Sequence, residues 1–145
     1  MKAVPYIDTS ALAKWYVNEP RSDDFEAFLQ QQARADISRL TVVEFRCLLA
    51  RRQRALEVTP RQARRVFAAF EEDVRDGFLF VHPLEDRHAV SALALIQRLE
   101  RHPLRTLDAL HLAVALDLKS PKVATADRVL TAAAQELGME VVRFD

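Results

Sequence analysis

The chain has very little cysteine and glycine, and both shortages limit what it can be. Cys47 is the only cysteine among 145 residues, so no disulfide can form within the chain, and a reducing compartment is expected. Two glycines are too few for the glycine-rich loop that cradles phosphates in many nucleotide-binding proteins. The formal net charge is zero, so the overall charge favours neither a nucleic-acid nor a membrane partner.

Long apolar runs are also missing. No uncharged stretch approaches the roughly 18 residues that a membrane helix needs, and the opening MKAVPYIDTS lacks the apolar segment of a signal peptide. Half of the residues are nevertheless hydrophobic and 29% are charged, which is typical of a chain that buries a core. We therefore expect one cytoplasmic domain spanning residues 1–145, with no membrane partner.

Short β-prone segments alternate with helical patterns along the chain. The strands are expected at residues 3–7, 36–38, 78–82, 122–125 and 140–144. The helices are expected directly after Asp8 and at residues 22–35, 41–56, 60–76, 86–100, 107–118 and 128–137. This alternation predicts an α/β fold, in which a central parallel sheet of about five strands is flanked by about seven helices.

Four acidic residues stand where strands end or helices begin. Asp8 and Asp127 follow predicted strands, while Glu44 and Asp108 lie in the first turns of predicted helices. Each has a purely structural explanation. Asp8 and Asp127 could be N-caps, Thr41 and Glu44 form a T-x-x-E capping box, and Asp108 would suit the positive end of a helix dipole.

The apolar surroundings of these acids favour a shared site. The helix that contains Glu44 presents Cys47 and Leu48 on the same face, and Asp108 opens the apolar run ALHLAVAL. Neither helix start has an obvious cation close by in sequence. Because ligands collect at the carboxyl ends of parallel strands, the four acids could converge there. Carboxylates so close together would repel one another without a cation, and their oxygens suit Mg²⁺ or Mn²⁺.

Four stretches of the sequence together span nearly the whole chain: IDTSALAKWYVNEP, SRLTVVEFRCLLAR, LRTLDALHLAVAL and VATADRVLTAAAQELGMEVV. In this order they resemble the PIN-domain nucleases and, among them, the VapC-type toxins. The resemblance implies a PIN-like fold and an endoribonuclease that depends on Mg²⁺ or Mn²⁺. It also implies a cognate antitoxin protein, an RNA substrate and a homodimer within a toxin–antitoxin assembly.

The resemblance also assigns site residues. The catalytic and metal-binding acids of the family fall on Asp8, Glu44, Asp108 and Asp127. The supporting polar residues would be Thr9, Ser10 and Thr125.

Arginines clustered near these segments are candidate RNA contacts. The candidates are Arg46, Arg51, Arg52, Arg105 and Arg128. A basic cluster of this kind can bind phosphates, but it can equally be a solvated helix surface or an antitoxin-binding face. His111 is expected to be a hydrogen-bonded core residue outside the site.

Two alternatives stay open at this stage. One is a PIN nuclease of RNA processing or decay that has no antitoxin, and the other is a catalytically silent RNA- or protein-binding module of the same fold. A phosphoaspartyl hydrolase of the haloacid dehalogenase type is excluded because Asp8 is followed by Thr9 and Ser10, where that mechanism needs a second aspartate.

Overall fold

A five-stranded parallel sheet forms the centre of the molecule in the computed structural model, which describes residues 3–145. The strands are β1 (Tyr6–Ile7), β2 (Ala35–Ser38), β3 (Leu79–His82), β4 (Lys122–Thr125) and β5 (Glu140–Arg143). They are arranged in the order β3-β2-β1-β4-β5, and every neighbouring pair is parallel. All the carboxyl ends therefore lie at one edge of the sheet, and the predicted parallel sheet is confirmed.

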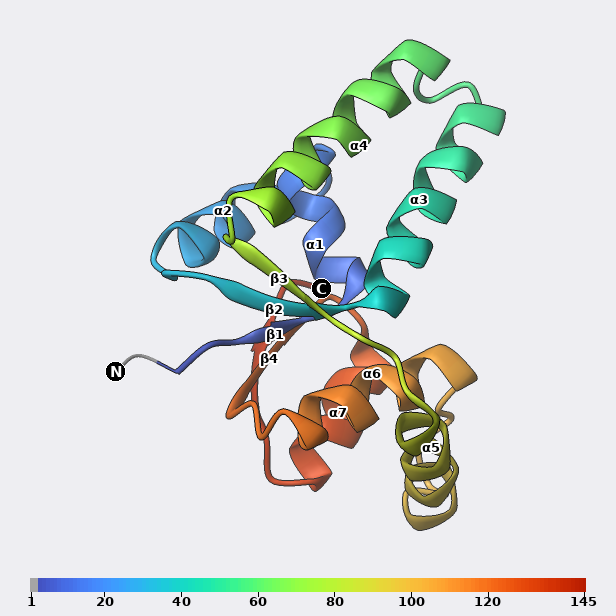
Figure 1. Cartoon of the computed structure of the whole chain (residues 1–145). Coiled ribbons are helices and arrows are strands. Elements are labelled where there is room, and N and C mark those ends of the chain that lie inside the picture. Colours follow the sequence, from blue (N-terminus) through green and yellow to red (C-terminus); the bar gives the residue numbers. More distant parts are fainter. Residues whose placement is uncertain (1–2) are drawn as a thin grey trace.

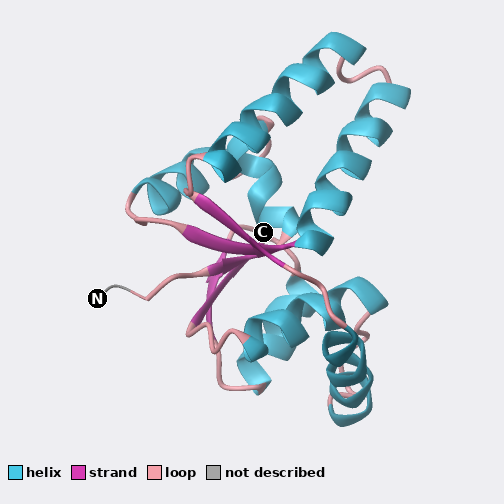
Figure 2. Cartoon of the chain, in the orientation of Figure 1, coloured by secondary structure: helices cyan, strands magenta, loops and turns pink. Residues whose placement is uncertain are grey.

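Seven helices cover the two faces of the sheet within the described residues (Figures 1 and 2). One face carries α1 (Thr9–Tyr16), α2 (Ser22–Gln30), α3 (Arg39–Arg54) and α4 (Pro60–Arg75), and the other carries α5 (Asp86–Arg98), α6 (Thr106–Asp117) and α7 (Arg128–Glu136). Parallel sheets need both faces covered, because their strands are apolar on both sides. No helix between residues 3 and 145 has the length and hydrophobicity to cross a bilayer.

The sheet divides the interior into two hydrophobic cores. Ile7 of β1 packs in the core beneath α1–α4, whereas the adjacent Tyr6 packs in the core beneath α5–α7. Successive strand side chains point to opposite faces, so this two-residue strand contributes to both cores. Figure 1 shows α3 and α4 as a long hairpin that projects beyond the sheet.

Two helix starts differ from the sequence prediction. We expected Thr41 to cap the third helix, but α3 begins at Arg39 with Ser38 as its N-cap, and Thr41 Oγ1 accepts a hydrogen bond from the Ser38 backbone N–H at 3.3 Å. The prediction of a T-x-x-E capping box is therefore wrong, and Glu44 lies in the second turn of α3. Similarly, α6 begins at Thr106, one residue before the expected start, with Arg105 as its N-cap.

The α4 boundaries follow the sequence closely. Thr59 is the N-cap and accepts a hydrogen bond from the Gln62 backbone N–H, and Pro60 is the first helical residue, where its missing N–H is tolerated. Gly77 has φ = +80°, a conformation that favours glycine, just after the helix ends.

The aromatic contacts of the α3–α4 hairpin generate a stability prediction. Phe70 is fully buried against Tyr16, Phe45 and Phe67, so Phe70→Ala removes a large packed side chain and leaves a cavity. We expect it to lower the free energy of unfolding by about 3–5 kcal/mol, measured by urea denaturation. The control, Phe80→Ala on the edge strand, removes a side chain that is 46% exposed and should cost less than half as much. Equal losses would contradict this packing.

Candidate functional site

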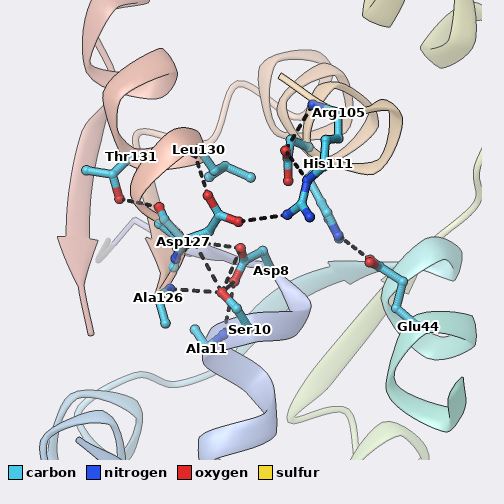
Figure 3. Close-up of polar contacts among 12 residues, drawn as sticks. Asp8, Ser10, Ala11, Glu44, Arg105, His111, Ala126, Asp127, Leu130 and Thr131 are labelled. Atoms are coloured by element: carbon cyan, nitrogen blue, oxygen red, sulfur yellow. Dashed lines mark hydrogen bonds and ion pairs between the residues drawn. The ribbon is translucent and has the colours of Figure 1, made fainter. Parts of the chain in front are cut away.

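A cavity of about 560 Å³ lies at the carboxyl edge of the sheet, and all four predicted acids line it. They come from distant segments: Asp8 follows β1, Glu44 lies on α3, Asp108 lies on α6 and Asp127 follows β4. Figure 3 shows the side chains of Asp8, Glu44 and Asp127 around this region. The lining also includes Thr9, Ser10, Cys47, Leu48, Arg51, Arg105, Thr106, Leu107 and His111.

Asp8 is buried and serves as the N-cap of α1, which is one of the two roles that the sequence left open for it. Its carboxylate accepts hydrogen bonds from the Ala11 backbone N–H at 3.0 Å, the Ser10 hydroxyl at 2.8 Å and the Thr125 hydroxyl at 2.6 Å. Burial raises the pKa of Asp8 above its ordinary value, because removal from water disfavours the charged form, although His111 and these hydrogen bonds oppose the rise. The charged form of Asp8 is therefore less stable in the folded protein than it would be in water.

The hydroxyl groups of Ser10 and Thr125 connect the loop after β4 to the start of α1 through hydrogen bonds. The Ala126 backbone N–H donates to Ser10 Oγ, and the Asp127 backbone N–H donates to Thr125 Oγ1, each at 2.9 Å. Asp127 is the N-cap of α7 and accepts from the Leu130 backbone N–H through Oδ1 at 2.9 Å (Figure 3). The supporting positions predicted as Ser10 and Thr125 therefore orient both N-cap aspartates.

Glu44 is held through one of its two carboxylate oxygens. Oε1 accepts hydrogen bonds from the Thr9 hydroxyl at 2.8 Å and from His111 Nε2 at 2.5 Å, the second of which is drawn in Figure 3. Burial by itself would raise the pKa of Glu44, but the hydrogen bond and positive charge of His111, together with the Thr9 hydroxyl, outweigh burial. The pKa of Glu44 therefore lies below its ordinary value, so the group is ionised at neutral pH.

Arg105 supplies a cation to the other two acids. Its backbone N–H and its Nε lie 3.1 and 3.4 Å from Asp108 Oδ2, and a terminal guanidinium nitrogen lies 3.4 Å from Asp127 Oδ2 (Figure 3). The expectation that no cation stands near Asp108 in sequence is therefore wrong, because Arg105 precedes it by one helical turn. Since the Arg105 side chain is 77% exposed, solvent weakens both ion pairs.

Two of the carboxylates have an oxygen available to a divalent cation, although the four side chains are not arranged around a single ion position. Among the described residues, no three Asp, Glu, His or Cys side chains are grouped as ligands of one ion. Glu44 Oε2 and Asp108 Oδ1 accept no hydrogen bond from residues 3–145. Every buried side-chain oxygen of residues 3–145 has a hydrogen-bond partner. Glu44 Oε2 and Asp108 Oδ1 have none, so these two oxygens are accessible to solvent. This oxygen chemistry fits Mg²⁺ or Mn²⁺, provided that Arg105 moves aside.

The five candidate arginines fall into different surroundings. Arg51 is exposed, lines the cavity together with Arg105, and makes no ion pair with another described residue. Arg52, by contrast, pairs with Glu19 and Glu57, which leaves its guanidinium already neutralised.

The other two arginines do not line the cavity. Arg46 lies over the Phe67 ring, 5.9 Å from its centroid, beside a separate apolar surface of α3 and α4. Arg128 lies close in sequence to Asp127, but its Nε pairs with Asp145 at 3.0 Å.

Sequence reasoning excluded His111 from the site, yet its ring lines the cavity and contacts Glu44. It follows Asp108 by three residues, a spacing that places two side chains on the same face of a helix. That periodicity could have indicated that His111 and Asp108 face the same region. The contact with Glu44 joins α6 to α3, so no local pattern predicts it.

Solved structures share this fold at low sequence identity. The VapC20 toxin from Mycobacterium tuberculosis, described as cleaving the sarcin–ricin loop, is 19% identical with a TM-score of 0.72, over 88% of this chain and 93% of that chain. The DNA-bound VapBC structure from Salmonella typhimurium is 18% identical with a TM-score of 0.68, over 99% of this chain and 100% of that chain. FitAcB from Neisseria gonorrhoeae is 17% identical with a TM-score of 0.68, over 95% of this chain and 96% of that chain. These likenesses show the fold.

The family assignment comes from the sequence itself. A search of curated proteins found no match. A family model described as the PIN domain, however, matches residues 6–145, which is nearly the whole chain. The match includes all four acids that line the cavity, and it confirms the PIN resemblance seen in the sequence. This chain therefore belongs to the PIN domain family.

Proposed function

We propose that this protein is a metal-dependent endoribonuclease that acts as the toxin of a toxin–antitoxin pair. The observation that carries the proposal is the gathering of four carboxylates from four separate segments around one cavity of a PIN domain. The structural relatives support the biological role, since one is a sarcin–ricin loop-cleaving toxin and others are VapBC and FitAcB complexes. On this proposal the protein acts on RNA in the cytoplasm.

Asp8, Glu44, Asp108 and Asp127 would hold Mg²⁺ or Mn²⁺. When bound, such an ion would lower the pKa of an attacking water and offset the charge that develops on the scissile phosphate. Asp108 or Asp127 would accept the proton of that water, while Ser10 and Thr125 keep Asp8 in its orientation. In this hydrolysis the attacking water would bond to phosphorus and the 3′-oxygen would leave, which gives a 5′-phosphate and a 3′-hydroxyl. No attack by the 2′-hydroxyl is needed.

Arg51 and Arg105 are the arginines we assign to phosphate binding. They line the cavity from α3 and from the start of α6, so a strand entering it would meet both guanidinium groups. Arg105 balances carboxylates in the metal-free protein. Once a divalent cation takes over that role, the guanidinium becomes free to bind an RNA phosphate.

The proposed antitoxin would silence the site by inserting an arginine or lysine into the cavity. The contacts of Arg105 support this mode of inhibition, since its guanidinium already lies within 3.4 Å of oxygens of both Asp108 and Asp127. A homodimer within the toxin–antitoxin assembly remains part of the proposal.

Asp8→Asn tests the carboxylate set. The raised pKa of Asp8 means that its charge destabilises the folded, metal-free protein at pH values above that pKa, and that this cost disappears as the pH falls and the group is protonated. At pH 7 the variant should therefore melt at an equal or higher temperature than the wild type. Its cleavage of RNA hairpins should fall at least about 100-fold. Scanning calorimetry and a gel-based cleavage assay measure the two effects.

Metal binding supplies the control for this variant. At an Mn²⁺ concentration about 100 times the dissociation constant, the wild type should gain about 2.7 kcal/mol of stability, and Asp8→Asn should gain less. An equal gain in both proteins would mean that the ion binds elsewhere, and wild-type cleavage by Asp8→Asn would remove this residue from the mechanism.

Arg51→Gln tests the RNA path. The variant should raise the KM for an RNA hairpin and make the slope of log affinity against log salt shallower by about 0.7–1, as expected for the loss of one phosphate contact. Arg54→Gln is the matched control, since Arg54 is exposed on the same helix but does not line the cavity. Equal effects of the two variants would show that the helix attracts RNA only through its general charge.

A further inference from the structure

A chain of buried hydrogen bonds runs from Glu44 into the protein interior. His111 Nε2 lies 2.5 Å from Glu44 Oε1, and His111 Nδ1 lies 2.7 Å from the Tyr6 hydroxyl. The Tyr6 hydroxyl in turn lies 3.0 Å from Ser38 Oγ. Tyr6 and Ser38 are fully buried and His111 is only 4% exposed, so water does not compete for these contacts.

The chemistry of Glu44 fixes the direction of the outermost hydrogen bond. At neutral pH a glutamate side chain is a carboxylate, which only accepts hydrogen bonds. His111 Nε2 must therefore carry a proton and donate a hydrogen bond to Oε1. Both ring nitrogens are then engaged, Nε2 with Glu44 and Nδ1 with Tyr6, so the ring is not free to become a metal ligand in this arrangement.

This contact determines which oxygen of Glu44 is engaged and which one stays free of hydrogen bonds from the described residues. His111 and Thr9 both bind Oε1, from α6 and α1 respectively, while Oε2 accepts no hydrogen bond from the described residues. A glutamate on a helix surface otherwise samples several rotamers, and fixing it costs up to about 2 kcal/mol of side-chain entropy. Side chains from α1, α3 and α6 thus meet at Glu44 Oε1, and Glu44 Oε2 stays available to a ligand.

We propose that His111 is a positioning residue for the metal site. It holds Glu44 through Oε1 so that Oε2 is ready to bind a divalent cation, and Tyr6 fixes the imidazole ring in the orientation that makes this possible. Hydrogen bonds from a neighbouring residue to a metal-binding side chain commonly account for a 10- to 100-fold difference in metal affinity. The inference rests on the proposed metal dependence and extends it to residues outside the four acids.

Mn²⁺ affinity of the metal-free protein, measured by calorimetric titration, provides the test. His111→Leu removes the donor and nearly keeps the volume, and it should weaken Mn²⁺ binding about 10- to 100-fold. His111→Gln retains an N–H near the position of Nε2, so its affinity should stay within a few-fold of the wild type. Tyr6→Phe, which keeps the ring in the core but frees His111, should give an intermediate loss and serves if His111→Leu does not fold.

His88→Leu is the matched control. His88 is also buried, at 3% exposure, and its two ring nitrogens contact the Glu85 backbone N–H at the start of α5 and Asp117 at the end of α6. It does not line the cavity. This variant should lose stability without losing Mn²⁺ affinity.

Three outcomes would overturn the inference. Wild-type Mn²⁺ affinity in a folded His111→Leu protein would reduce His111 to a core residue, and a loss in His111→Gln as large as in His111→Leu would mean that the hydrogen bond is not the cause. Equal losses in His111→Leu and His88→Leu would indicate general destabilisation. All three leave the proposed function standing, whereas a wild-type protein that binds no Mn²⁺ would overturn the proposed metal dependence as well.

Discussion

Crowded negative charge at the carboxyl edge of the sheet is the constraint to which the surrounding structure responds. Carboxylates that share a cavity repel one another, and the buried one, Asp8, also loses its hydration. The fold compensates with backbone N–H groups at helix starts, with hydroxyl groups and with the side chains of Arg105 and His111. Each acid has at least one oxygen held in this way. The result is a cavity whose carboxylates are partly balanced by the protein itself, which fits the proposed binding of a divalent cation.

The parallel topology explains why this charge gathers in one place. Because β1 and β4 are neighbours, the chain leaves both strands at the same edge, and Asp8 and Asp127 become N-caps of α1 and α7 side by side. The other two acids are brought in by helices from opposite faces of the sheet, α3 from one and α6 from the other (Figure 1). The two hydrophobic cores hold these helices in place, so the site depends on packing from both sides.

Local chemistry made much of this predictable from sequence. The strand–helix alternation yielded the five strands and seven helices, and Asp8 could be recognised as a cap because its partner, Ala11, is three residues away. The start of α3 was misplaced because Thr41 is a good N-cap type, whereas Ser38, which belongs to β2, takes that role. The contact of His111 with Glu44 depends on how α6 packs near α3, and no periodicity within one helix encodes that distance.

The proposed function connects these observations: on it, the cavity would exchange its internal cation, Arg105, for a divalent one. Anomalous X-ray scattering near the manganese absorption edge, recorded from crystals grown with Mn²⁺, tests it most directly. The account predicts an anomalous peak bound by oxygens of the four cavity carboxylates, with Glu44 Oε2 among them and the Arg105 guanidinium displaced from Asp108 and Asp127. A peak outside this cavity, or an unoccupied cavity with Arg105 still in place at saturating Mn²⁺, would contradict it.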